Sequence, residues 1–169
     1  MTSCVIQKGV ANSIHTFAGV QLRNECNRQM ENLRIKYGRK YEQPTAVPMI
    51  TDAYNLPAKK VIHVVGPIVN GPLIKEHEKL LAQCYTSCLD MAAENGLNSI
   101  AFCCISTGVF MFPNERAAEI AVETVEKWLD ENRSDMKVIF NVFKDFDLDI
   151  YDQLLGIDGD IGQVLDELM

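Results

Sequence analysis

The strongest constraint on the fold is a repeated order in which a buried strand is followed by a helix. Two continuous apolar runs, Val61–Val65 and Ser99–Cys104, are typical of strands buried on both faces. Each is followed by a turn and then by apolar residues at helical spacing, over Leu73–Asn95 and Glu115–Asn132. This alternation predicts an α/β fold whose parallel or mixed sheet is covered by helices on both faces.

Shorter segments complete this pattern. The sequence predicts a helix over Ala11–Lys36, strands over Met49–Tyr54 and Lys137–Phe143, and a last helix over Asp147–Leu155. Gly96 and Gly156 suit the ends of two of the helices. We therefore predict one domain over residues 1–156 and an acidic tail over residues 157–169.

The segment after the strand Ser99–Cys104 has the composition of an anion-binding turn. Ser106 and Thr107 carry hydroxyl donors, and Gly108 allows a positive φ or the close approach of a ligand. Pro113 suits the first turn of the helix that follows. Backbone N–H groups in such a turn, together with a helix N-terminus, attract phosphate oxygens. An ordinary strand-to-helix loop is the alternative interpretation.

The bulk composition excludes several classes of partner. The formal net charge is −7 and is spread along the chain, which disfavours a nucleic-acid partner but not one small anion in a local pocket. No apolar run reaches the roughly 20 residues that a membrane-spanning helix needs. No secretory signal is visible, so we expect a cytoplasmic protein and no membrane partner.

The cysteines support the same expectation. All six are spaced without a Cys-x-x-Cys pattern, at positions 4, 26, 84, 88, 103 and 104. Adjacent strand residues face opposite sides, so Cys103 and Cys104 cannot easily bind one metal ion. We expect reduced, mostly buried thiols, with Cys103 and Cys104 in the core.

Three stretches together resemble a macrodomain, the ADP-ribose-binding fold. They are Gly9–His15, Val61–Pro67 and Ile105–Gly108, and the resemblance extends from about Gly9 to Gly156. It implies a three-layer α/β sandwich that binds ADP-ribose or a related nucleotide diphosphate. The details of Ile14–Arg23 are similar to the bacterial zinc-containing branch, whose members remove ADP-ribose from modified proteins.

The resemblance also assigns candidate site residues. The loop residues Ser106, Thr107, Gly108, Val109 and Phe110 match the family's phosphate loop, with core packing as the alternative for Phe110. Phe143 matches a region that lines the adenosine site. Asn12 resembles a catalytic-loop asparagine, although Asn12 and Ser13 are also good N-caps for the first helix.

The chain departs from the family pattern near its first residues. The Asn-Ala-Ala-Asn-type motif, which contacts the distal ribose, is not found before Gly9. The positions of the branch's zinc ligands fall on Thr2, Gln7 and Gly9, so we expect neither zinc nor another cofactor. Ala11 replaces an acidic residue that contacts the adenine amine. Hydrolysis is therefore left open, and a degenerate structural or interaction module without a ligand is the alternative function.

The resemblance also implies that the sheet lacks the N-terminal strands of the family, namely an edge strand and the normally central strand that carries the missing motif. The central position cannot stay unpaired. Thr2–Gln7 contains strand-forming Thr, Val and Ile, so we predict that these residues fill the gap. Closure of the two flanking strands on each other and a strand from a second copy in a homodimer are the alternatives.

Other polar residues have plain structural interpretations. His15 and His63 lie in apolar patterns and are interpreted as structural histidines, and His77 as a solvated helix residue. Acidic residues gather near the start of the last helix, where the helix dipole favours them. Spaced arginines in the first helix and the loop after it are expected to face solvent; they are Arg23, Arg28, Arg34 and Arg39.

Overall fold

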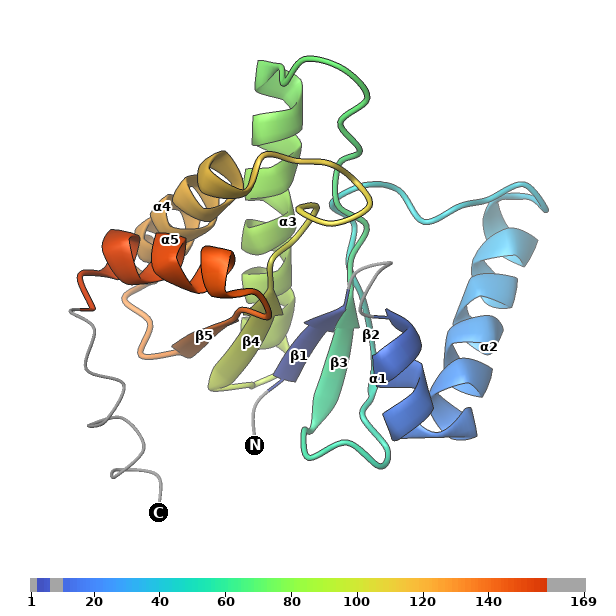
Figure 1. The fold of residues 1–169 in the computed structure, drawn as a ribbon. Coiled ribbons are helices and arrows are strands. Elements are labelled where there is room, and N and C mark those ends of the chain that lie inside the picture. The colour runs from blue at the N-terminus through green and yellow to red at the C-terminus, as the bar shows by residue number, and fades with distance from the viewer. Residues whose placement is uncertain (1–2, 7–10, 158–169) are drawn as a thin grey trace.

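The computed structural model describes residues 3–6 and 11–157 (Figure 1). Helices and strands alternate in this part of the chain as the apolar pattern predicts. In chain order they are β1 (Ser3–Ile6), α1 (Ala11–Ala18), α2 (Val20–Tyr37), β2 (Met49–Asp52), β3 (Lys60–His63), α3 (Lys75–Glu94), β4 (Ser99–Cys103), α4 (Asn114–Asn132), β5 (Lys137–Asn141) and α5 (Asp145–Leu155).

The described strands form one mixed sheet in the order β2-β3-β1-β4-β5. Strand β1 lies at its centre and is parallel to both neighbours, with Cys4 opposite Val61 of β3 and Ala101 of β4. Strand β2 is antiparallel to β3 and forms one edge. The prediction that residues within Thr2–Gln7 occupy the central position is confirmed for Ser3–Ile6. Backbone pairing with both neighbours explains why this position is filled, since unpaired buried N–H and C=O groups are costly.

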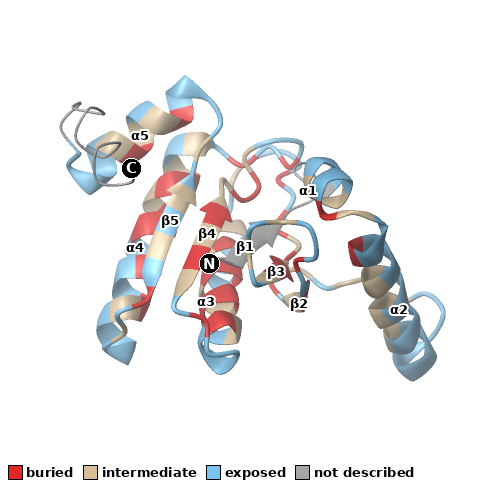
Figure 2. Cartoon of the chain, turned by 90° about the horizontal axis from the view of Figure 1, so that it is seen from below, coloured by how far each residue is buried: buried red, intermediate tan, exposed pale blue. Residues whose placement is uncertain are grey.

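Neighbouring residues of β3 show the layers of the sandwich. The side chain of Ile62 packs in the main core with α3 and α4, whereas Val61 packs with Ile14 of α1 on the other face. Figure 2 shows the buried faces of α3 and α4 turned toward the sheet. In the main core, the ring of Tyr85 lies 4.9 Å from that of Phe102, centroid to centroid. The predicted three-layer α/β class is confirmed.

The prediction of a single helix over Ala11–Lys36 is wrong, because two helices, α1 and α2, are separated at Gly19. Gly19 has φ +88°, which ends the first helix and redirects the chain. A Cβ at this position would lie 2.8 Å from Asn55 Nδ2, so close packing also favours glycine here. The apolar periodicity continues across the break, which is why the sequence alone does not show it.

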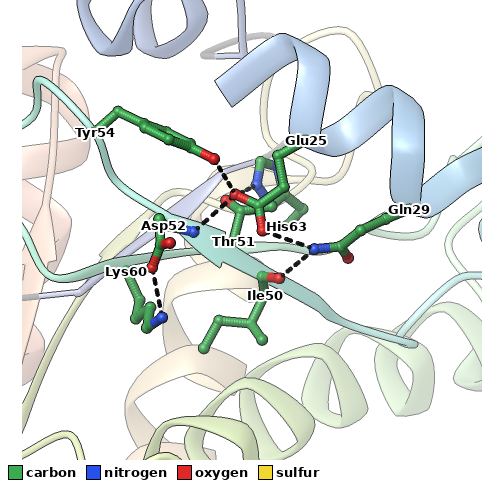
Figure 3. A network of polar contacts seen from close by, with 8 residues as sticks. All are labelled: Glu25, Gln29, Ile50, Thr51, Asp52, Tyr54, Lys60 and His63. Atoms are coloured by element: carbon green, nitrogen blue, oxygen red, sulfur yellow. Dashed lines mark hydrogen bonds and ion pairs between the residues drawn. The ribbon is translucent and has the colours of Figure 1, made fainter. Parts of the chain in front are cut away.

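Two side chains of α2 cover the exposed edge of β2 (Figure 3). Glu25 accepts hydrogen bonds from the N–H of Asp52 (3.1 Å) and the hydroxyl of Tyr54 (2.8 Å). Gln29 Nε2 donates to the carbonyl oxygen of Ile50 (2.9 Å). These contacts occupy backbone groups that an edge strand otherwise offers to another chain. They also attach α2, which has few other contacts with the sheet.

His63 lies beneath this network and has a structural role. Its Nε2 lies 2.9 Å from Thr51 Oγ1 and 3.8 Å from Cys26 Sγ. Burial, with a smaller contribution from His15, lowers the pKa of His63 to about 4. The ring is therefore neutral near pH 7, and the structural interpretation of His63 is confirmed.

Several local expectations need correction. Cys103 and Cys104 are only half-buried rather than fully in the core. His77 is also half-buried, and its Nδ1 accepts a hydrogen bond from the N–H of Ile74 (3.4 Å) at the start of α3. Pro113 precedes α4 as its N-cap instead of lying in the first turn. In the described residues, no helix is both long and apolar enough to cross a bilayer.

Candidate ligand-binding site

The predicted phosphate loop connects β4 to α4 and closes on itself. The N–H of Phe112 donates to the carbonyl oxygen of Ser106 (3.0 Å), and the N–H of Met111 donates to that of Gly108 (3.0 Å). Ser106 is buried with φ +67°, and Met111 has φ +56°. Gly108 is not among the residues with positive φ, so the left-handed conformation expected there is found at Ser106 and Met111 instead. Such conformations cluster at ligand sites because they aim the backbone.

The closed loop leaves a run of backbone donors. Within the described part of the chain, the N–H groups of residues 107–110 have no hydrogen-bond acceptor. Helix α4 begins immediately afterwards, at Asn114, and its N-terminus adds partial positive charge. Successive free N–H groups beside a helix N-terminus form an anion site. A Cβ at Gly108 would meet no atom within 4 Å, so the space beside the loop is open.

The two hydroxyls of the loop are less available than the sequence suggests. Thr107 Oγ1 donates to the carbonyl oxygen of Cys104 (3.1 Å), and the side chain of Ser106 is fully buried. Both side chains therefore shape the loop. The donors left available in this loop belong to the backbone.

Phe110 lies in the interior, whereas Val109 lies at the surface. Phe110 is buried, and its carbonyl oxygen accepts a hydrogen bond from the N–H of Val69 (2.9 Å). This bond attaches the loop to the segment that follows β3, as the adjacent course of the two loops in Figure 1 shows. The side chain of Val109 is 81% exposed at the rim. The burial of Phe110 agrees with the core-packing alternative, and its contact with a ligand stays a prediction.

Phe143 lies just after β5, the strand next to β4 in the sheet. Its side chain is 96% exposed, which is unusual for a phenylalanine in a folded domain. Because β4 and β5 are parallel, their carboxyl ends lie at the same edge of the sheet. Phe143 and the phosphate loop therefore leave the sheet side by side, which is where ligands bind in open α/β sheets.

Asn12 lies in the helix that follows β1 along the chain. It is the second residue of α1, so the N-cap interpretation is wrong. Its carbonyl oxygen accepts a hydrogen bond from Thr16 Oγ1 (2.8 Å), and its side chain is exposed. Helix α1 packs against β3, and it follows β1, which is parallel to β4, the strand that the phosphate loop follows.

No metal site is found among residues 3–6 and 11–157, where no three His, Cys, Asp or Glu side chains converge. His15 and His63 lie 6.3 Å apart, centroid to centroid, with Cys26 beside His63. Burial raises the pKa of the Cys26 thiol. Burial also lowers the pKa of His15, and the charge of Arg23 lowers it further. Thr2, Gln7 and Gly9, the positions that match the ligands of the zinc branch, lie outside the described residues.

One polar pair at this edge of the sheet is not predicted from the sequence. Asn114 Nδ2 donates to Asp147 Oδ1 (2.5 Å) and so joins the first turns of α4 and α5. The only signal in the sequence is the position of each residue: Asn114 follows Pro113 at a helix start, and Asp147 belongs to an acidic helix start.

Comparisons with known proteins agree with this geometry. A family model described as Macro domain matches residues 2–121. A protein-ADP-ribose hydrolase from Treponema medium is 54% identical over 147 residues, covering 87% of this chain and 54% of the relative. Two solved structures also match. The Oceanobacillus iheyensis macrodomain with MES bound has a TM-score of 0.79 and 32% identity, covering 100% of this chain and 87% of that one. The Trypanosoma brucei macrodomain in complex with ADP-ribose has a TM-score of 0.76 and 30% identity, covering 92% and 64%.

The chain belongs to the macrodomain family, as the resemblance of its motifs indicates. It spans about half the length of the curated relatives that it matches, 54% in the case cited.

Proposed function

We propose that this domain binds ADP-ribose at the carboxyl ends of β4 and β5. The observation that carries the proposal is the run of N–H groups at residues 107–110, beside the N-terminus of α4, for which residues 3–6 and 11–157 provide no acceptor. These donors suit the diphosphate of the ligand. The exposed ring of Phe143 offers a flat apolar surface for the adenosine. The solved relative from Trypanosoma brucei, which carries ADP-ribose, supports this choice of ligand.

Calorimetric titration of the chain with ADP-ribose tests the proposal. We expect saturable binding with one ligand per chain. Adenosine alone should bind more weakly, because it does not reach the N–H groups of residues 107–110. Thermal stability offers a second measurement, since a ligand at 100 times its dissociation constant adds roughly 2.7 kcal/mol to the free energy of unfolding. Absence of both heat and stabilisation would favour the alternative of a degenerate interaction module.

We further propose that the full activity, removal of ADP-ribose from proteins, involves Asn12. The activity is supported by the 54% identity to a protein named as a protein-ADP-ribose hydrolase, and the role of Asn12 by the resemblance of Gly9–His15 to the family's motif. Incubation with an ADP-ribosylated protein, followed by mass spectrometry of that protein, measures the activity. Asn12→Ala should lower the rate and leave ADP-ribose binding near that of the wild type. Asn24→Ala, an exposed asparagine of α2, is the matched control. An equal rate in all three chains would exclude a role for Asn12.

A further inference from the structure

The two loops that form the proposed site are joined through the helices that follow them. The phosphate loop leads into α4, and the segment with Phe143 leads into α5. Asn114 is the first residue of α4, and Asp147 is the third residue of α5. The hydrogen bond from Asn114 Nδ2 to Asp147 Oδ1, at 2.5 Å, therefore connects the two loops at the point where each ends.

The carboxyl group of this pair is buried, and the bond depends on both partners. Asp147 is only 6% exposed, and Asn114 is half-buried. A carboxylate in such a place has to be hydrogen-bonded, because removing it from water is costly otherwise. Its position in the first turn of α5 also suits the helix dipole. Hydrogen bonds to charged groups contribute more than neutral ones, so this contact is among the stronger polar contacts near the site.

The rest of α5 is held differently. The ring of Tyr151 lies 5.0 Å from that of Phe140 of β5, and the side chain of Tyr151 is buried in the core. This contact anchors the later turns of the helix to the sheet. The first turn, next to Phe143, is oriented against α4 by Asp147. Loss of the pair should therefore change the position of the Phe143 segment without releasing the helix.

We propose that Asn114 and Asp147 are positioning residues that set the spacing between the phosphate loop and the Phe143 segment, and so select ligands that span both. The inference rests on the proposed function. A ligand that touches both loops gains affinity only when their spacing matches its length. A ligand that touches one loop is indifferent to that spacing. The pair thus governs the preference for a whole nucleoside diphosphate sugar over an isolated diphosphate.

Exchange of donor and acceptor provides the test. Asn114→Asp places two carboxylates together and removes the hydrogen bond. Asp147→Asn keeps an acceptor, because the amide oxygen of the new side chain can accept from Asn114. The double variant N114D/D147N restores the bond with the roles reversed. Each chain is titrated with ADP-ribose by calorimetry and with inorganic pyrophosphate by NMR chemical shifts, which also report whether the fold is retained.

We expect Asn114→Asp to weaken ADP-ribose binding by about tenfold or more, as loss of a charged hydrogen bond implies. Asp147→Asn and the double variant should remain within about threefold of the wild type. Pyrophosphate affinity should be the same in the wild type, in the double variant and in Asn114→Ala, none of which changes the net charge beside the phosphate loop. Asn114→Ala, which removes the bond without adding charge, should repeat the loss if Asn114→Asp does not fold.

Three results would overturn the inference. The first is unchanged ADP-ribose affinity in Asn114→Asp and Asn114→Ala. The second is a double variant as weak as Asn114→Asp. The third is a parallel loss of pyrophosphate affinity in Asn114→Ala, which would indicate a purely structural role. Failure of the wild-type chain to bind ADP-ribose is seen before any variant is made, and it overturns the proposed function and this inference together.

Discussion

The N–H of Phe112 donates a hydrogen bond to the carbonyl oxygen of Ser106 across the turn between β4 and α4. This bond closes the loop and orients the backbone of the residues between them. Ser106 accommodates the closure with a positive φ, a conformation that costs a residue other than glycine of the order of 1 kcal/mol or more. The strain lies at the same loop as the free N–H groups of residues 107–110, as expected of a ligand site.

Gly108→Val should abolish ADP-ribose binding while the fold is retained. A side chain at this position meets open space rather than protein atoms, so the domain can accept it. The same space is needed by a ligand that approaches the N–H groups of residues 107–110. Calorimetry measures the binding, and circular dichroism the fold. Ala93→Val on the exposed face of α3 is the control for an added valine. Binding by Gly108→Val with the affinity of the wild type would rule out this loop as the site.

Gly19→Ala should lower the free energy of unfolding by about 1–3 kcal/mol, because φ +88° with ψ 177° is a backbone conformation essentially restricted to glycine. The new Cβ would also lie 2.8 Å from Asn55 Nδ2. Gly38→Ala is a matched control, since Gly38 has φ +108° and no atom within 4 Å of its Cβ position. Denaturant unfolding of both variants separates backbone strain from contact with Asn55. A smaller loss for Gly19→Ala than for Gly38→Ala would show that the contact is unimportant.

The sequence predicts helices and strands better than it predicts breaks within a helix or strained backbone conformations. The apolar run at Val61–Val65 and the helical spacing around Cys84 correspond to β3 and α3, because burial sets both patterns. The break at Gly19 is hidden, because α1 and α2 continue one apolar periodicity. The positive φ of Ser106 results from closure of the loop by Phe112, a contact that local sequence does not encode. For the same reason the bond between Asn114 and Asp147, which are 33 residues apart, appears only in the structure.

The low pKa of His63 predicts that the domain loses stability in mild acid. Its pKa in the folded chain is about 4, below the ordinary value of 6.5. Between these two values the unfolded chain binds the proton more readily, so stability falls as the pH is lowered from 6.5 toward 4. The full loss in the free energy of unfolding is about 3 kcal/mol. It should be visible as the difference in unfolding free energy between the wild type and His63→Gln across this range. His77→Gln at the start of α3 is the control. A wild type and a His63→Gln variant with parallel pH profiles would contradict this prediction.

The central position of β1 in the sheet predicts that the stability of the sheet depends on the backbone of Ser3–Ile6. Val5 is paired with Ile62 of β3 in the central strand. Val5→Pro removes a backbone donor there, and proline is not tolerated in a central strand. Val5→Thr keeps both the donor and a β-branched side chain, so it is the matched variant. We expect Val5→Pro to aggregate or to lose most of its stability, and Val5→Thr to unfold close to the wild type. Thermal unfolding and size-exclusion chromatography measure both effects. A monomeric Val5→Pro chain as stable as Val5→Thr would mean that β1 does not hold the sheet together.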